Sequence, residues 1–468
     1  MLRAVAGDET GQPVYLHLVV ACEARILGAM TDKDALIDKD TDNLSPERAQ
    51  EREEVLTKAR AAKDVAPVIA QLSTPQKNEI LETAAQDLLD NTALILGANE
   101  RDIVNGKEAG LSDQLLDRLR LDEDRIAGIA NGLRLVAGLQ DPVGEILQGS
   151  TMDNGIEMKQ VRVPLGVMGM VYEARPNVTV DAFGLAIKSG NVPLLRGSKS
   201  ARESNKQLVD LLQDTLEKLG HPREAVQLLP CETRDSVQDL ITARGLVDLV
   251  IPRGGAGLIN AVVLGATVPT IETGTGNCHF YIDKSADLDK GIAMVVNGKT
   301  RRTSVCNSTE TVLLDSALSD DDKLKVVRAL QDAEVTIHGE VQELSGFGVE
   351  NAVEATEEDW AEESLSMDIN AKVVDGIDGA IAHIQKWSTG HTEGIAAQDA
   401  DILQKFANEV DAAAVMLNAS TAFTDGEVYG MGAEIGISTQ KLHARGPMAL
   451  PELTSSKWIL QGTGHTRP

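Results

Sequence analysis

The sequence predicts an α/β protein of two lobes, each built on a parallel sheet. Its 468 residues exceed what a single hydrophobic core usually holds, so two or three lobes are expected. From about residue 160 onward, short apolar runs alternate with helical patterns, which is typical of buried parallel strands. We place the junction between the lobes near residues 285–295.

The first 44 residues differ from the rest of the chain. The acidic, weakly patterned stretch at 30–44 predicts disorder, and Met30 is an alternative start of translation that would make the preceding residues a mis-annotated leader. A helix is expected directly afterwards, with Ser45 as N-cap and Pro46 at its first position. Helical patterning then continues to about Val136.

Each lobe is expected to contain five strands separated by helices. In the first lobe the strands are predicted at 163–174, 191–197, 225–230, 247–255 and 268–274, with helices that include 178–190 and 200–220. In the second lobe the strands are predicted at 308–315, 335–339, 371–376, 393–399 and 412–420, with helices at 319–334, 377–388 and 400–410.

Composition excludes several classes of protein. A net charge of −28 repels polyanions, so nucleic acid and anionic membranes are not expected partners. An anionic substrate would need a local basic pocket. The four cysteines are scattered without a CxxC pair, which favours a reducing cytoplasm over a disulfide framework or a structural zinc site. No metal site is predicted.

Cys306 is the cysteine with the strongest case for chemistry. Between Lys290 and Thr309 there is no acidic residue, but there are four cations, Lys290, Lys299, Arg301 and Arg302. Such a field lowers the pKa of a thiol and attracts an anionic leaving group. From these residues alone, a small buried and inert cysteine is an equal alternative. Cys278 is adjacent to His279, but neighbours on a strand point to opposite faces.

Two strand-to-helix turns are candidates for nucleotide binding. The segments at 194–201 and 250–257 each place glycine and arginine at the carboxyl end of a strand, where open α/β sheets bind nucleotides. Two ordinary tight turns are the alternative interpretation. A G-x-G-x-x-G fingerprint is absent, and the stretch at 293–300 lacks the first glycine of a P-loop.

Five segments carry a family resemblance: YEARPNVTVDAFGLAIKSGN, IPRGGAGL, ETGTGNCHFYIDKSADL, RRTSVCNSTETVLL and NASTAFTDGEVYGMGAEIGISTQKLHARGPM. From about Val55 to Trp458 the chain resembles the gamma-glutamyl phosphate reductases, also called glutamate-5-semialdehyde dehydrogenases, of the aldehyde dehydrogenase superfamily. The resemblance implies a Rossmann-like cofactor domain, a smaller α/β catalytic domain and a β-arm for oligomerisation. The implied bounds are 45–290 for the cofactor domain with its arm at about 140–162, 291–430 for the catalytic domain, and 431–468 for a C-terminal segment that returns to the cofactor domain and oligomerises.

The resemblance also implies an activity. Gamma-glutamyl phosphate would be reduced by NADPH to glutamate 5-semialdehyde and phosphate, the second step of proline biosynthesis, in a homo-oligomer with transient contact to glutamate 5-kinase. The main alternative is an ordinary NAD(P)-dependent hydrolytic aldehyde dehydrogenase, and a third is a catalytically silent scaffold. The cations before Cys306 and the long C-terminal segment argue against the hydrolytic alternative.

Several residues acquire implied roles from the same resemblance. Cys306 matches the nucleophile, which would form a thioester, and Arg302 would bind either the phosphate or a carboxylate of the substrate. The oxyanion hole combines the Cys306 N–H with Asn177 or Arg175, and since Arg175 stands where ordinary aldehyde dehydrogenases have asparagine, that choice stays open. Glu272 is either a proton shuttle or a vestige of hydrolysis. Cofactor contacts are implied for Arg196, Ser198, Lys199, Gly254, Gly255 and Glu363, and substrate contacts for Asn418, Ser420 and Arg445.

Overall fold

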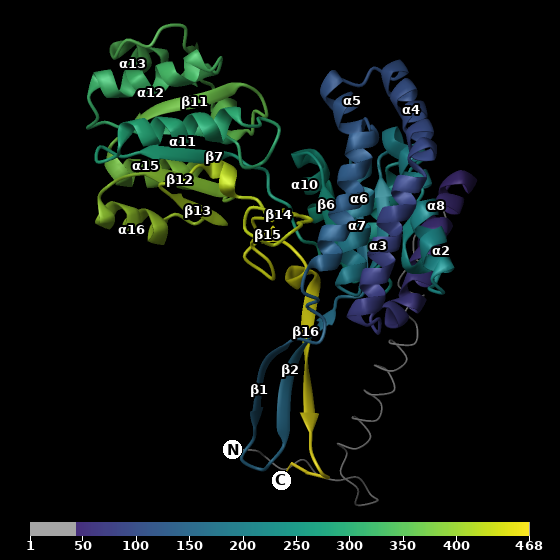
Figure 1. Cartoon of the computed structure of the whole chain (residues 1–468). Coiled ribbons are helices and arrows are strands. Elements are labelled where there is room, and N and C mark those ends of the chain that lie inside the picture. The colour runs from purple at the N-terminus through teal and green to yellow at the C-terminus, as the bar shows by residue number, and fades with distance from the viewer. Residues whose placement is uncertain (1–43, 468) are drawn as a thin grey trace, which may run out of the picture.

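A computed structural model describes residues 44–467, which form two α/β lobes and a projecting arm (Figure 1). The first lobe contains a four-stranded parallel sheet in the order β5-β4-β3-β6. Its strands are β3 (Val167–Tyr172), β4 (Val192–Gly197), β5 (Gln227–Leu228) and β6 (Leu249–Arg253). With β3 flanked by β4 and β6, this is the order of one half of a Rossmann fold.

Helices cover this sheet and account for the long N-terminal helical pattern. The first one begins as predicted, because Ser45 Oγ accepts a hydrogen bond from Arg48 N–H and Pro46 is its first residue. The helices are α2 (Pro46–Ile69), α3 (Thr74–Asp90), α4 (Thr92–Glu108), α5 (Asp113–Leu119), α6 (Glu123–Gly138), α7 (Pro176–Lys188), α8 (Arg202–Lys218), α9 (Asp235–Thr242) and α10 (Ala256–Gly265). One apolar cluster joins these helices to the sheet, except for α5, whose Leu116 and Leu119 pack in a smaller cluster with Ile103 and Ala201.

The prediction of a strand at 268–274 is wrong. This segment makes a single parallel bridge, from Thr270 to Val250, and then turns to pair Thr273 with Ser438. Pairing with β6 therefore ends after this one bridge, because the backbone leaves the first sheet to reach the C-terminal segment.

The second lobe contains a seven-stranded parallel sheet in the order β10-β9-β11-β8-β7-β12-β13. Its strands are β7 (Cys278–Ile282), β8 (Thr309–Asp315), β9 (Thr336–Gly339), β10 (Val353–Glu354), β11 (Asp368–Val374), β12 (Thr392–Ala396) and β13 (Ala414–Leu417). The helices are α11 (Leu288–Thr300), α12 (Asp320–Asp332), α13 (Val341–Gly346), α14 (Glu357–Ala361), α15 (Gly376–Trp387) and α16 (Ala400–Glu409). Two apolar clusters pack on this sheet.

The predicted boundary between the lobes, at 290/291, needs correction. Strand β7 begins at Cys278 and pairs with β8 and β12, so the second lobe starts before the expected junction. The apolar run at 278–282 indicates a buried strand, but its pattern does not reveal which sheet the strand joins. The boundary therefore lies near residue 277.

The arm is a three-stranded antiparallel sheet that projects below both lobes in Figure 1. It consists of β1 (Ile146–Thr151), β2 (Glu157–Pro164) and β16 (Thr454–Gln461), with β2 in the middle. A small sheet of β14 (Gly436–Ser438) and β15 (Gly446–Met448) lies between the two lobes. The predicted leader lies outside the described residues, apart from Leu44. Within residues 44–467, no helix is long and apolar enough to cross a membrane.

Candidate active site

Cys306 lies in the turn between α11 and β8, at the amino end of the second sheet. Backbone at Gly276 packs directly on it, since a Cβ added to Gly276 would lie 1.5 Å from the Cys306 carbonyl oxygen. Cys278 Sγ donates to that same oxygen at 3.2 Å. On the other side, Asn307 Nδ2 donates to the Thr424 carbonyl at 2.9 Å. The turn that carries Cys306, named the nucleophile turn for the predicted role of this residue, is thus fixed from both directions.

A buried ion pair supports this turn. Lys299 Nζ lies 2.9 Å from Glu310 Oε2, and both side chains are shielded from solvent. Ser364 Oγ donates to the same carboxylate at 2.5 Å. The pair therefore ties the end of α11 to the start of β8 and to the segment after α14.

The cations near Cys306 in sequence do not surround its thiol. Lys299 is engaged by Glu310, and Lys290 is exposed and pairs with Asp287 at 2.8 Å. Arg301 and Arg302 are exposed. The expectation that this run lowers the pKa of the thiol is wrong. Burial instead raises the pKa of Cys306 to about 11, and of the neighbouring charges Arg253 opposes the rise while Glu363 and Glu434 add to it.

The raised pKa makes a testable prediction about alkylation. Without substrate, only a small fraction of Cys306 is thiolate at neutral pH, and that fraction grows about tenfold per pH unit below the pKa. The rate of iodoacetamide labelling at Cys306, followed by peptide mass spectrometry, should rise at this slope from pH 7 to 9. A rate that levels off below pH 8 would contradict the burial argument.

The two oxyanion-hole candidates differ in their surroundings. Arg175 is half-buried at the N-cap of α7 and interacts electrostatically with Cys306. Burial, with Arg253 as the strongest neighbouring charge, lowers the pKa of Arg175 to about 10. Asn177 instead donates from Nδ2 to Asp181 Oδ2 at 3.1 Å. Arg175 therefore lies within electrostatic reach of the thiol, whereas the Asn177 amide is engaged within α7.

Of the two predicted glutamates, Glu363 is the one coupled to the thiol. Its carboxylate accepts the backbone N–H of Gly276, and its charge raises the pKa of Cys306. Burial in turn raises the pKa of Glu363. Glu272 is half-buried on the segment before β7, and its backbone N–H donates to Gln440 Oε1 at 3.1 Å.

Arg196 does not point outward to a ligand. Its buried guanidinium donates to Ser236 Oγ and to the carbonyl oxygens of Gly197 and Thr233. Ser198 hydroxyl lies 2.7 Å from the hydroxyl of Ser200. Lys199 is exposed and lies 3.4 Å from Glu232, whose other oxygen pairs with Arg202 at 2.5 Å. Lys199 and Arg202 are therefore the first two exposed cations after β4.

Gly254 and Gly255 form the turn between β6 and α10. The Gly255 N–H donates to Glu173 Oε2 at 3.0 Å, and a Cβ on Gly254 would lie 2.8 Å from the same atom. A carboxylate thus occupies the N-terminus of a ten-residue helix, where backbone N–H groups attract negative charge. The turn has the geometry to accept a phosphate in place of Glu173.

The three predicted substrate contacts all have partners within the protein. Asn418 exchanges hydrogen bonds with the Ala397 backbone through its amide oxygen and nitrogen. Ser420 Oγ accepts the Ala422 N–H as a helix cap. Arg445 pairs with Asp411 at 2.8 Å. Their observed contacts are structural, and the substrate roles stay predictions.

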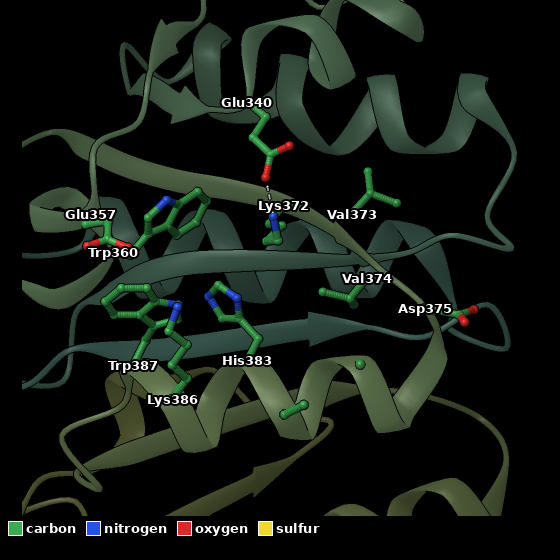
Figure 2. Close-up of a pocket in the computed structure, with 12 residues that line it drawn as sticks. Glu340, Glu357, Trp360, Lys372, Val373, Val374, Asp375, His383, Lys386 and Trp387 are labelled. Atoms are coloured by element: carbon green, nitrogen blue, oxygen red, sulfur yellow. Dashed lines mark hydrogen bonds and ion pairs between the residues drawn. The ribbon is translucent and has the colours of Figure 1, made fainter.

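A groove on the second lobe lies away from these residues. Figure 2 shows His383 beside Trp360 and Trp387, with Lys372 reaching Glu340. Its volume is 540 Å³, but none of its lining residues is a predicted site residue. The lining residues are Glu340, Glu357, Trp360, Lys372, Val373, Val374, Asp375, Gly379, Ala382, His383, Lys386 and Trp387. Burial lowers the pKa of His383 to about 3, so this imidazole is neutral at physiological pH.

A profile of the aldehyde dehydrogenase family matches residues 39–343, more than half of the chain. The chain belongs to the aldehyde dehydrogenase family. Its fold is correspondingly aldehyde dehydrogenase-like, as the sequence motifs predicted.

Solved structures of this family include close relatives of the chain. It is similar to a gamma-glutamyl phosphate reductase from Thermotoga maritima, at 41% identity over 89% of this chain and 100% of that chain, with a TM-score of 0.86. Another similar structure is a gamma-glutamyl phosphate reductase from Saccharomyces cerevisiae, at 28% identity over 91% and 99% of the two chains, with a TM-score of 0.46. An acetylating aldehyde dehydrogenase from Geobacillus thermoglucosidasius, at 16% identity over 91% and 100%, has a TM-score of 0.65 and shows the fold alone.

Arg253 is the site residue that the sequence analysis missed. It ends β6 in the segment at 250–257, where the motif indicated an arginine near a nucleotide. Its charge lowers the pKa of Cys306, although the two residues are far apart in sequence. The only sequence signal was an arginine at the carboxyl end of a buried strand.

Proposed function

We propose that this protein reduces gamma-glutamyl phosphate to glutamate 5-semialdehyde and phosphate, the second step of proline biosynthesis from glutamate. The observation that carries the proposal is the 41% identity to the Thermotoga maritima reductase over all of that enzyme's length. The fixed turn at Cys306 supplies the nucleophile that such a reaction needs. A hydrolytic aldehyde dehydrogenase is the less favoured alternative.

The chemistry begins at Cys306 Sγ. The thiol gives up its proton and attacks the acyl carbon, the bond from that carbon to the phosphate oxygen breaks, and a thioester remains on the enzyme. The Cys306 N–H and Arg175 are the donors we assign to the developing oxyanion, with Asn177 as the alternative. When bound, NADPH supplies the hydride that converts the acyl group to the aldehyde, and Cys306 leaves as thiolate.

Two carboxylates and one arginine complete the proposed chemistry. Glu363, whose pKa is raised by burial, is suited to take the thiol proton as Cys306 attacks, besides its assigned contact with the cofactor ribose. Glu272 stays a proton shuttle or a vestige. Arg302, exposed on the nucleophile turn, would guide the phosphate at the entrance of the site.

We assign cofactor binding to the first lobe. The turn at Gly254 and Gly255 fits a pyrophosphate, since a carboxylate already occupies the helix N-terminus there. Ser198 and Lys199 lie after β4, beside which the adenosine ribose would sit in a Rossmann-like fold. Arg196 donates its hydrogen bonds to Ser236 and Thr233, so it would stabilise the end of β4 and not contact the cofactor.

If the protein prefers NADPH to NADH, the cations that follow β4 should determine that preference. Replacing both Lys199 and Arg202 with alanine removes two cations that would face the 2′-phosphate, so the KM for NADPH should rise about tenfold while that for NADH changes little. Steady-state kinetics with both cofactors measures this. Lys206→Ala, an exposed lysine paired with Asp210 on α8, is the matched control. Equal changes for NADPH and NADH would contradict the assignment.

We assign the arm to oligomerisation. Strand β16 exposes Trp458, Ile459 and Leu460, and β1 exposes Ile146 and Leu147, so large apolar side chains gather on strands at the edges of this sheet. Exposed apolar patches on edge strands mark protein interfaces. The double variant Trp458→Asp, Leu460→Asp should shift the protein toward the monomer in sedimentation velocity. An unchanged sedimentation coefficient in a folded variant would contradict this role.

The location and partners of the enzyme follow from the same proposal. A soluble enzyme of the cytoplasm is consistent with free cysteines at 231, 278 and 306. The lability of an acyl phosphate makes transient contact with glutamate 5-kinase advantageous.

Reverse turnover tests the proposed function. With glutamate 5-semialdehyde and NADP, reduction of NADP should require inorganic phosphate and should saturate with it. Continuous turnover without phosphate would identify a hydrolytic aldehyde dehydrogenase instead.

A further inference from the structure

The guanidinium of Arg253 has no hydrogen-bond acceptor among the described residues. The residue is half-buried at the end of β6, and its carbonyl oxygen accepts the Glu173 N–H at 3.3 Å. Within residues 44–467, its side chain makes no hydrogen bond or ion pair with another residue. A half-buried guanidinium with five N–H donors and no protein acceptor is suited to bind an anionic ligand.

The fold makes room for this side chain. A Cβ added to Gly436, the first residue of β14, would lie 2.9 Å from Arg253 Nη1. Strand β14 therefore passes close to the guanidinium, and a side chain at 436 would crowd both Arg253 and Thr273, whose Cγ2 would lie 2.6 Å from the added Cβ. The C-terminal segment thus closes over Arg253 on one side of the site.

Several charged groups lie within electrostatic reach of Arg253. The acids among them are engaged elsewhere: Glu434 accepts the Gly426 N–H at 2.9 Å, and Asp181 accepts from Asn177. Arg175 is a second half-buried guanidinium, with no hydrogen-bonded acid among the residues that the structure describes, and the two arginines repel each other. Two such cations beside one thiol are costly without an anion between them.

We propose that Arg253, with Arg175 beside it, binds the phosphoryl group that Cys306 displaces. This inference rests on the proposed function, since it names the residue that holds the leaving group. The phosphoryl group departs from the carbon that Sγ attacks, so its binding residue must lie next to Cys306. Packing puts Arg253 in that place: its Nη1 and the Cγ2 of Thr273 both approach the Cβ position of Gly436, and Gly276, in the same segment as Thr273, packs on Cys306. The effect of the Arg253 charge on Cys306 agrees with this position. Arg302, on the exposed turn, then acts at the entrance.

Two variants and one control test the proposal in the full-length enzyme. In reverse turnover, Arg253→Gln should raise the KM for inorganic phosphate about ten- to a hundredfold, whereas the KM for the semialdehyde should stay within about twofold. Arg253→Lys keeps the charge but loses the bidentate geometry, so it should recover only part of the phosphate affinity. Arg244→Gln, an exposed arginine of the same lobe, is the control for folding and charge.

A binding measurement separates this inference from the proposed function. Inorganic phosphate should slow the alkylation of Cys306 by iodoacetamide in the wild type and in Arg244→Gln, but not in Arg253→Gln. If the wild type is protected but shows no phosphate-dependent turnover, the proposed function fails and the anion site stands. If Arg253→Gln has wild-type protection and a wild-type KM for phosphate, or if only its KM for the semialdehyde rises, the inference is overturned.

Discussion

Gly276→Ala should reduce the rate of the reaction by at least about a hundredfold. A Cβ at this position would lie 1.5 Å from the Cys306 carbonyl oxygen, so the nucleophile turn has to move. Displacement of a reacting group by about 1 Å costs on the order of a hundredfold in rate. The same shift breaks the hydrogen bond from Cys278 Sγ and alters the contact of Glu363 with the Gly276 N–H. The measurement is kcat/KM, together with the labelling rate of Cys306.

A second glycine serves as the control, because an added Cβ there contacts no other atom and only the backbone effect of the Gly→Ala change remains. Gly97 lies in α4 with no atom within 4 Å of an added Cβ, so Gly97→Ala should retain activity and gain about 0.5–1 kcal/mol in the free energy of unfolding. Gly276→Ala should instead lose about 1–3 kcal/mol. Wild-type kinetics in Gly276→Ala would show that the turn tolerates movement.

Cys306→Ala should lower turnover by about 10⁴-fold or more, because no other group can form the thioester. The alanine is smaller and uncharged, and removing a thiol whose pKa burial raises leaves no ion unpaired. Thermal stability should therefore change little. Cys231→Ala, at a half-buried thiol outside the nucleophile turn, is the control and should retain activity. Substantial phosphate-dependent turnover in Cys306→Ala would exclude covalent catalysis at this residue.

The sequence predicts the α/β architecture because strand and helix periodicities are local. The position of β7 shows where local pattern ends: its apolar run indicates a buried strand, but its partners β8 and β12 come later in the chain. The same limit explains the failure at 268–274, where the backbone pairs with Ser438. Pairing partners depend on contacts that no short segment contains.

In the candidate site, too, local sequence predicts one part and long-range contacts decide the rest. The cations near Cys306 in sequence leave a reactive and an inert thiol as equal alternatives, and the family motif favours the reactive one. In the structure those cations do not act on the thiol as expected. Lys299 turns inward to Glu310, whereas Arg253 reaches the site from another lobe. Charge counted along the chain is thus a poor guide to charge in space. Burial, which raises the pKa of Cys306, is a property of the packed fold that the motif could not reveal.

One measurement tests the central claim, that Cys306 carries the acyl group and phosphate accepts it. The enzyme is mixed with excess semialdehyde and NADP without phosphate, and NADPH is followed by rapid-mixing absorbance. The account predicts a burst of about one NADPH per subunit, then arrest until phosphate is added, and no burst in Cys306→Ala. Continuous NADPH formation without phosphate, or a full burst in Cys306→Ala, would contradict it.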